Sequence, residues 1–329
     1  TTEIYTLSLH DALPILTCSD DYIVDWGDGV IENFIAGIKA EHSYDFSSIP
    51  ANTICSRGYK QVVISVTPQA GAHFTSLDFG SQILGLNSNG SSSILDMAVV
   101  GVLISTLTFS NVKPRLMEQF TFIGSNAITN FSSMFSNCSS LQTILLLDTA
   151  EGTNFNSMFQ YCYSLQNIPL LNTAEGTNLS SMFNSCSSLK TIPLLNTAKC
   201  TNFNSMFYGC SSLQTIPLLD TAEGTNFNSM FSNCSSLKTI PLLDTAKGTS
   251  FSSMFQNCSS LVRSSIVGTK VSISYNGCAL SKDALVEIFS NLASGVTGQT
   301  ITISGNYGAS ELTQADRDIA LNKGWTISG

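Results

Sequence analysis

Cysteine is the most regularly spaced of the residues able to do chemistry in this chain, and it raises three possibilities: disulfide bonds, metal binding and nucleophilic catalysis. Six of the ten cysteines recur every 24 residues, at Cys138, Cys162, Cys186, Cys210, Cys234 and Cys258. No two cysteines stand at CxxC spacing and no histidine lies near the six, so a metal site is not predicted. A disulfide requires a particular arrangement of two Cβ atoms, which a repeating series does not guarantee. We therefore predict reduced thiols that act as small buried hydrophobic residues.

One further cysteine, Cys200, stands where other copies of the same repeat carry a glycine, as at Gly176 and Gly224. That position lies in a polar, glycine-containing segment, which predicts a loop. Cys200 is therefore predicted to be the most exposed thiol of the series.

Histidines and carboxylates are the remaining candidates for catalysis. Neither His42 nor His73 has a serine or cysteine at a recognisable spacing, although spacing alone does not exclude a triad formed in space. His42 is interpreted as a structural histidine. Paired carboxylates for glycoside hydrolysis exist among the repeated aspartates, but a repeated residue usually has a repeated structural task. We predict no catalytic residue and no cofactor, with an extracellular hydrolase as the weaker alternative to a non-enzymatic protein.

Two aspartates near the N-terminus, Asp25 and Asp28, lie at a tight turn with Gly27 and Gly29. Two carboxylates in one turn make calcium binding a hypothesis. The competing interpretation is that each aspartate caps the backbone of its own turn, as this residue type does in turns generally.

The elements that position these residues come from a repeat that runs from Asn130 to Leu261. The copy at 226–249 reads NFNSMFSNCSSLKTIPLLDTAKGT, and the register does not slip between copies. A strict period of 24 residues predicts a solenoid, because each unit buries its apolar face only by stacking on its neighbours.

The first half of each copy has the apolar spacing of a short helix. Phe227, Met230, Phe231 and Cys234 stand at i, i+3, i+4 and i+7, and Asn226 precedes them as a candidate N-cap. The second half follows the pattern LxxIxL and predicts a strand in which Ile240 and Leu242 point to the same side. Pro241 is then expected to point outward.

Two series of outward positions in the second half are the candidate binding residues. The leucines are Leu147, Leu171, Leu195, Leu219 and Leu243, and the polar series is Asp148, Asn172, Asn196, Asp220 and Asp244. Five copies stacked about 4.8 Å apart would give an apolar stripe roughly 20–25 Å long. Such a stripe is either covered or a contact surface. The alternative is that each leucine tucks beneath the corner between strand and loop.

The repeat itself, with its MF-xx-C-xx-L-xx-I form, resembles the BspA-like leucine-rich repeats of surface proteins from bacteria, their phages and some protists. The resemblance covers residues 130–261. It implies a right-handed α/β solenoid with strands on one face and short helices on the other. It also implies adhesion and surface display, and it brings no catalytic residues.

Three segments precede the repeat, and each has a sequence pattern that differs from it. The segment Thr6–Ile15 resembles a translated sequencing adapter, which implies a metagenomic assembly, so residues 1–16, with His10 and Asp11, are set aside from the fold. Residues 17–68, with the pattern VDWGDG…HxY…VxISV, resemble a small all-β, immunoglobulin-like sandwich of the polycystic-kidney-disease (PKD) type. Residues 69–129 are interpreted as degenerate first coils that cap the solenoid.

The solenoid is expected to span residues 130–270, and residues 271–329 are interpreted as its C-terminal cap. Ser281 caps a predicted helix that ends near Leu292. Thr313 and Asp316 have the spacing of a capping box at the start of a second helix. The sequence ends with a predicted strand at 325–328.

Composition limits the class of partner. Charged residues are only 11% of the chain and the net charge is −9, whereas a nucleic-acid footprint requires basic stripes. No apolar run reaches the length of a membrane span, so no membrane insertion is predicted. We expect an extracellular, cell-surface or virion-associated adhesin or phage-tail receptor-binding protein that recognises a protein or glycan. The alternative is a structural fibre or self-associating scaffold.

Overall fold

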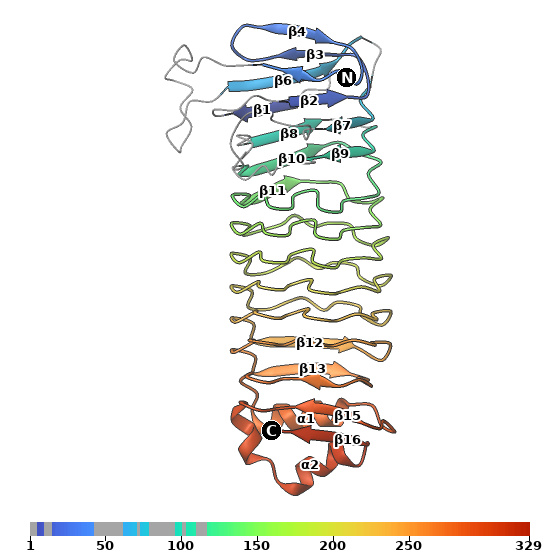
Figure 1. Cartoon of the computed structure of the whole chain (residues 1–329), viewed down its shortest axis with the longest axis vertical. Helices are drawn as coiled ribbons and strands as arrows, with labels where there is room; N and C mark the ends of the chain where they lie inside the picture. Colours follow the sequence, from blue (N-terminus) through green and yellow to red (C-terminus); the bar gives the residue numbers. More distant parts are fainter. Residues whose placement is uncertain are drawn as a thin grey trace. The chain divides into compact units, whose positions relative to one another are not determined.

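The computed structural model describes residues 5–9, 15–42, 62–70, 73–78, 96–100, 103–109 and 117–329. The chain divides into two compact units. The first consists of Thr1–Asn130 with Met134–Glu151, and the second of Phe131–Ser133 with Gly152–Gly329. Figure 1 shows the elements of both units in sequence colours.

The first unit contains two β-sheets. The larger, in spatial order, is β11 (Thr143–Leu146), β10 (Gln119–Ile123), β8 (Asp96–Val100), β1 (Tyr5–Leu9), β6 (Val62–Pro68), β3 (Tyr22–Asp25) and β4 (Ile31–Phe34). The smaller is β5 (Ala40–Glu41), β2 (Ile15–Cys18), β7 (Ser76–Asp78) and β9 (Thr106–Thr108). Strands β1, β3, β4 and β6 pair antiparallel, whereas β8, β10 and β11 pair in parallel, as stacked coils do.

The described parts of residues 17–68, which are 17–42 and 62–68, contain the strands β3, β4, β5 and β6. In β3, Tyr22 and Val24 are buried, and Trp26 follows them in the core. These strands share their sheet with later parts of the chain, because β6 pairs with β1 and β1 pairs with β8. The immunoglobulin-like character of residues 17–68 stays a prediction.

Two stretches of residues 1–16, which were set aside in the sequence-based reasoning about the fold, form strands. Tyr5–Leu9 forms β1 between β6 and β8, and Ile15 begins β2. Strand pairing is made by backbone groups, so any segment able to extend can supply it. His10 and Asp11 lie outside the described residues, and the origin of the segment stays a prediction.

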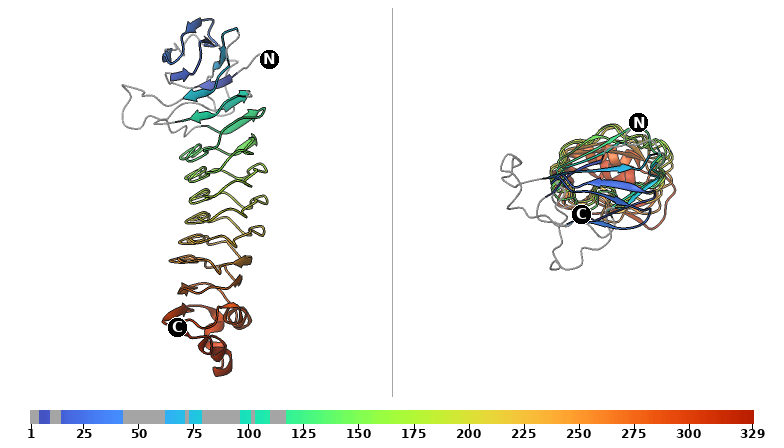
Figure 2. Two further views of the ribbon diagram at one scale, coloured as in Figure 1. Left: turned by 90° about the vertical axis from the view of Figure 1, so that its right-hand side faces the viewer. Right: turned by 90° about the horizontal axis from the view of Figure 1, so that it is seen from above.

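The second unit is a stack of coils, seen from the side in Figure 2. Two long parallel strands, β12 (Thr239–Asp244) and β13 (Arg263–Val267), belong to adjacent coils. Elsewhere the coils meet at single parallel bridges, which run from Asn154 through Asn178, Asn202 and Asn226 to Ser250. The predicted solenoid of stacked coils is therefore present in this unit.

The short helix predicted in each coil is absent from the described repeats. Ser157 and Tyr161 have φ values of 55° and 62°, and equivalent residues in other coils are also left-handed. The local hydrogen bonds are i to i+3 turns, such as Cys162 N to Phe159 O at 3.1 Å. An α-helix requires negative φ throughout and bonds from i to i+4.

Neighbouring coils supply the hydrogen bonds that a helix would have made internally. The N–H groups of Ser157 and Phe159 donate to the carbonyls of Ser180 and Met182, both at 2.9 Å. Every second N–H in this half of the coil therefore donates to a carbonyl of the next coil. These bonds satisfy the backbone groups that an α-helix would otherwise satisfy internally. The asparagines predicted as helix caps instead cap turns, since Asn178 Oδ1 accepts the N–H of Ser180 at 3.0 Å.

Two columns of stacked rings fill the interior of the second unit. One runs unbroken through Phe159, Phe183, Phe207, Phe231 and Phe255 to Tyr275, with ring centroids 4.7–5.8 Å apart. The other contains the pair Phe131–Phe155 and the run Phe203, Phe227 and Phe251. Leu179 interrupts the second column between Phe155 and Phe203, in a coil where the consensus phenylalanine is missing.

The cysteine series lies in this interior, as predicted. All nine described cysteines are free and buried. The thiols of Cys186, Cys210, Cys234 and Cys258 each donate to the carbonyl of a phenylalanine in the preceding coil, at 3.0–3.1 Å. Burial raises the pKa of Cys210 and Cys234 well above the ordinary thiol value, so they remain protonated.

Cys200 is buried too, so the prediction that it is the most exposed thiol is wrong. The glycines at its position face the phenylalanine column: a Cβ at Gly224 would lie 2.4 Å from the ring of Phe227, three residues on, and 3.1 Å from the ring of Phe203 in the preceding coil. At Cys200 the corresponding residue of the preceding coil is Leu179, which is smaller than phenylalanine. The smaller Leu179 therefore replaces one of the two rings that a side chain at position 200 would otherwise meet, while the counterpart of the other, Phe203, is kept.

The C-terminal part confirms most of its predicted elements. It contains β14 (Ile273–Ser274), α1 (Lys282–Asn291), β15 (Gln299–Thr302), the 3-10 helix η2 (Tyr307–Glu311), α2 (Gln314–Leu321) and β16 (Trp325–Ser328). Ser281 caps α1, and the capping box of Thr313 and Asp316 opens α2. The parallel sheet β14-β15-β16 continues the coil-like pairing to the end of the chain.

Candidate functional site

The strand half of each coil ends in a leucine pair whose two members have opposite environments. The first leucine is exposed: Leu170 by 74%, Leu194 by 61%, Leu218 by 59% and Leu242 by 54%. The second is buried, with 0–2% exposure at Leu171, Leu195, Leu219 and Leu243. In β12 the register shifts between Ile240 and Leu243, so simple alternation fails there.

This finding corrects the predicted outward leucine series. Leu147 in the first unit is buried like its four counterparts, so these leucines tuck beneath the corner, which was the alternative interpretation. Leu242, predicted to share the inner side with Ile240, is exposed instead. Sequence reasoning missed the exposed leucines because it assumed period-two alternation, although the repeated Leu-Leu pair was the available signal.

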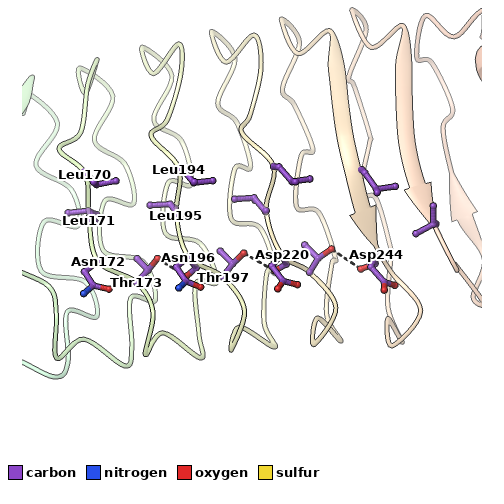
Figure 3. A pocket seen from close by; sticks show the side chains of 15 residues that line it. Leu170, Leu171, Asn172, Thr173, Leu194, Leu195, Asn196, Thr197, Asp220 and Asp244 are labelled. Carbon is purple, nitrogen blue, oxygen red and sulfur yellow. Dashed lines mark hydrogen bonds between the residues drawn. The ribbon is translucent and has the colours of Figure 1, made fainter.

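A groove of about 940 Å³ runs along this face of the second unit. Figure 3 shows the leucines and the polar side chains that line it. We call it the leucine groove and define it by two rows, the exposed leucines Leu170, Leu194, Leu218 and Leu242 and the polar residues Asn172, Asn196, Asp220 and Asp244. The groove therefore joins four coils and combines an apolar row with a polar one.

The polar row has a structural task in every coil. Asn172 Oδ1 accepts the backbone N–H of Ala174 at 3.1 Å, and Asp220 Oδ1 accepts that of Ala222 at 3.1 Å. Asn196 and Asp244 make the same bond, and Asp148 makes it in the first unit. These side chains shape the turn after the strand and remain exposed to solvent.

Buried threonines hold the coils together beneath the groove. Thr173, Thr197 and Thr221 are at most 2% exposed. The hydroxyl of each donates to the carbonyl of the polar residue in the next coil, at 2.7 Å in all three cases. The distance between successive polar residues is thus fixed by a side-chain bond as well as by the backbone.

The charges along the groove are uneven. The polar row carries amides at Asn172 and Asn196 and carboxylates at Asp220 and Asp244. Lys199 and Lys247 lie in the same coils, but they pair with Glu175 and Glu223 at 2.6 Å. Among the described residues, no lysine or arginine pairs with Asp220 or Asp244.

The aspartates considered for calcium bond to protein groups. Asp25 Oδ1 accepts the N–H of Gly27 at 2.9 Å and Asp28 Oδ1 accepts that of Val30 at 3.1 Å. Asp28 also contacts His42 Nε2 at 2.7 Å, and the His42 ring stacks on Trp26. Within the described ranges, no three His, Cys, Asp or Glu residues are grouped so as to hold a metal ion. Asp25 and Asp28 therefore cap their own turn, and His42 has a structural role.

These features define a class of protein: a repeat solenoid whose stacked coils present a row of exposed leucines beside a row of polar side chains. The chain belongs to the family described as "Mycoplasma protein of unknown function, DUF285", which matches residues 106–215 and 177–274. No curated protein matches it. The BspA-like and PKD resemblances stay predictions.

Among solved structures, the chain is similar to one titled "Crystal structure of T. pallidum Leucine Rich Repeat protein (TpLRR)". The identity is 17%, the match covers 71% of this chain and 90% of that one, and the TM-score is 0.30. A likeness this low supports no inference about partners. In the described part of the chain, no helix has the length and apolar character needed to cross a membrane.

Proposed function

We propose that this protein is a non-catalytic recognition protein that binds a partner macromolecule through the leucine groove. The observation that carries the proposal is the row of four exposed leucines, 54–74% exposed and in register over successive coils. Exposing a contiguous apolar row to water is unfavourable unless a partner covers it. We further propose an extracellular role as an adhesin or receptor-binding protein on a cell or virion.

Binding is favoured over catalysis by the composition of the groove. Its lining consists of leucine, asparagine, threonine, aspartate and one valine, with no histidine, cysteine or lysine to act as base or nucleophile. The hydroxyls of Thr173, Thr197 and Thr221 already donate to carbonyls. Each polar side chain also has one oxygen committed to its own turn. The remaining chemistry is that of a contact surface.

A protein partner is favoured over a glycan for a related reason. The groove lining contains no aromatic side chain on which a sugar ring could stack. Its largest exposed groups are aliphatic, which suits the apolar side chains of a protein partner.

The test compares two variants of the full chain for binding to a panel of intact bacterial cells. Leu194→Ser/Leu218→Ser removes the centre of the apolar row. Tyr208→Ser, at a residue 37% exposed and outside the groove lining, is the matched control. We expect the unaltered protein and the Tyr208 variant to bind the same cells and the double variant to lose binding. Equal binding by the two variants, or no binding by the unaltered protein, would contradict the proposal.

Self-assembly through the same leucines is the second candidate, because an exposed apolar row serves a second copy as well as a foreign partner. Light scattering over a range of protein concentrations separates the two. A mass that rises with concentration, and returns to that of one chain in Leu194→Ser/Leu218→Ser, would favour the scaffold role.

A further inference from the structure

We propose that the partner segment in the leucine groove is an amphipathic helix with basic residues at one end, which lies toward Asp220 and Asp244. This inference rests on the proposed function and specifies its ligand. It is carried by the charge distribution along the polar row and by the spacing of the coils.

The charge distribution is not required by the fold. Asn172, Asn196, Asp220 and Asp244 occupy equivalent positions and make the same bond to a backbone N–H, at 2.9–3.2 Å. Asparagine and aspartate both supply that oxygen acceptor, so the turn is formed with either residue. The carboxylates at one end of the groove therefore add charge without adding structure, and that charge is available to a partner.

The charge at that end is also unneutralised. Lys247, three residues after Asp244, pairs with Glu223, and Lys199, three residues after Asn196, pairs with Glu175, so neither contacts the groove aspartates. The chain as a whole carries a net charge of −9. A basic group beside two exposed carboxylates and an apolar row would gain Coulomb attraction and hydrophobic contact together.

The coil spacing selects a helix over an extended strand. Successive coils lie about 4.8 Å apart, which sets the interval between exposed leucines. Residues on one side of an α-helix, three or four positions apart, rise about 4.5–6 Å along its axis. Residues on one side of an extended strand recur about every 6.6–6.8 Å and would lose register within two coils. Four leucines span about 14 Å, or roughly ten residues of helix.

A second copy of this chain fits less well. Two acidic molecules, each at −9, repel as they approach. A second copy would also have to bring a basic helix to the groove. The two helices of its C-terminal part, α1 and α2, have no basic residue in their last turns. The geometry therefore points to a foreign, cationic segment.

The experiment uses two synthetic helical peptides, each about 14 residues long, with the same leucine face. One carries three lysines in its last turn and the other three glutamates. Affinity for the full protein is measured by fluorescence anisotropy at low and high salt. We expect the lysine peptide to bind about fivefold to tenfold more tightly at low salt, and the preference to fade at high salt.

Two charge variants supply the decisive comparison. Asp220→Asn/Asp244→Asn gives the acidic end the residues found at the other end, and Asn172→Asp/Asn196→Asp does the reverse. Because each substitution introduces a residue the chain already tolerates at an equivalent position, folding is preserved. The first variant should bind both peptides equally, and the second should bind the lysine peptide several-fold more tightly than the unaltered protein.

The outcomes separate this inference from the function on which it rests. If Leu194→Ser/Leu218→Ser abolishes cell binding but the charge variants do not alter peptide preference, the groove is a binding surface and the basic helix is wrong. If the unaltered protein binds neither peptide at about millimolar concentration, the basic helix is wrong as the ligand. The proposed function is then tested by the cell-binding experiment alone. A dimer of the unaltered protein that is absent in Leu194→Ser/Leu218→Ser would show that a second copy of the chain occupies the groove.

Discussion

The two sides of each coil in the second unit both repeat apolar residues in register, yet they have opposite environments. On one side, phenylalanine, methionine and cysteine form columns that are almost completely buried. On the other side, the first leucine of each pair is more than half exposed. A repeated apolar residue therefore indicates a shared environment in every coil, but not whether that environment is the core or the solvent.

The physical reason for the difference lies in how each side is closed. The aromatic side turns through left-handed residues and bonds to the next coil at every second N–H, so its side chains converge on one interior. The leucine side bends at the register shift, as in β12 between Ile240 and Leu243. Consecutive residues of a strand point to opposite faces in any case, and the register shift makes Leu243, rather than Leu242, the leucine that shares the buried side with Ile240.

The largest expected effect compares one residue from each side of the same coil. Phe207→Ala removes a fully buried ring from the unbroken column and should lower the free energy of unfolding by about 3–5 kcal/mol. Leu218→Ala, on the exposed side, should change it by less than about 0.5 kcal/mol. Urea unfolding followed by circular dichroism measures both. Similar losses in the two variants would remove the distinction between the sides.

A double-mutant cycle at Leu179 and Cys200 tests how tightly the aromatic column is packed. Leu179→Phe alone inserts a ring against the Cys200 side chain and should cost about 1–3 kcal/mol of unfolding free energy. Leu179→Phe/Cys200→Gly restores the residues that other coils carry and should recover most of that loss. An additive result, with no recovery in the pair, would show that the two positions do not share space.

The threonines beneath the groove give an intermediate effect. Thr221→Val keeps the shape of the side chain but removes the hydroxyl that donates to the carbonyl of Asp244 at 2.7 Å. The Asp244 carbonyl loses the partner supplied by the buried Thr221, so unfolding free energy should fall by about 1–2 kcal/mol. The control is Thr225→Val in the same coil, which removes an exposed hydroxyl that donates to Thr201 O at 3.1 Å, where water can replace the bond. Equal stability of the two variants would mean that water replaces the lost bond.

The smallest structural effect, and the most local, concerns thiol reactivity on the buried side. Burial raises the pKa of the Cys200 thiol to about 11, so little thiolate forms below pH 9. Cys200 and Cys210 should therefore remain unmodified by iodoacetamide at pH 8 in the folded protein and react fully in urea. Site-resolved mass spectrometry reads each cysteine separately. Rapid labelling of Cys200 alone in the folded protein would show that its thiol is exposed to solvent and would contradict this prediction.

Sequence reasoning performed best where a pattern had one physical solution. The strict period required stacking, and the regular cysteines could only lie inside, which Cys234 and its neighbours confirm. The caps of α1 and α2 were also readable, because Ser281, Thr313 and Asp316 act within one turn of their own helices. These features depend on hydrogen bonds between residues close in sequence or on exact repetition, and both can be recognised from the sequence alone.

Sequence reasoning failed where a pattern had two solutions. The spacing of Phe227, Met230, Phe231 and Cys234 suits a helix, but it suits equally a turn whose N–H groups bond to the next coil. The sequence of the pair Leu242–Leu243 is compatible with either leucine pointing into the core. In each case the deciding contact comes from a neighbouring coil rather than from nearby residues.

The sequence by itself determined that this protein is a stack of near-identical coils with a common interior of phenylalanine, methionine and cysteine. Only the tertiary structure decided which leucine of each pair faces solvent, that the coils turn without helices, and that Cys200 is buried. The physical reason is that period and composition belong to a single coil, whereas hydrogen bonds and packing between coils exist only after stacking.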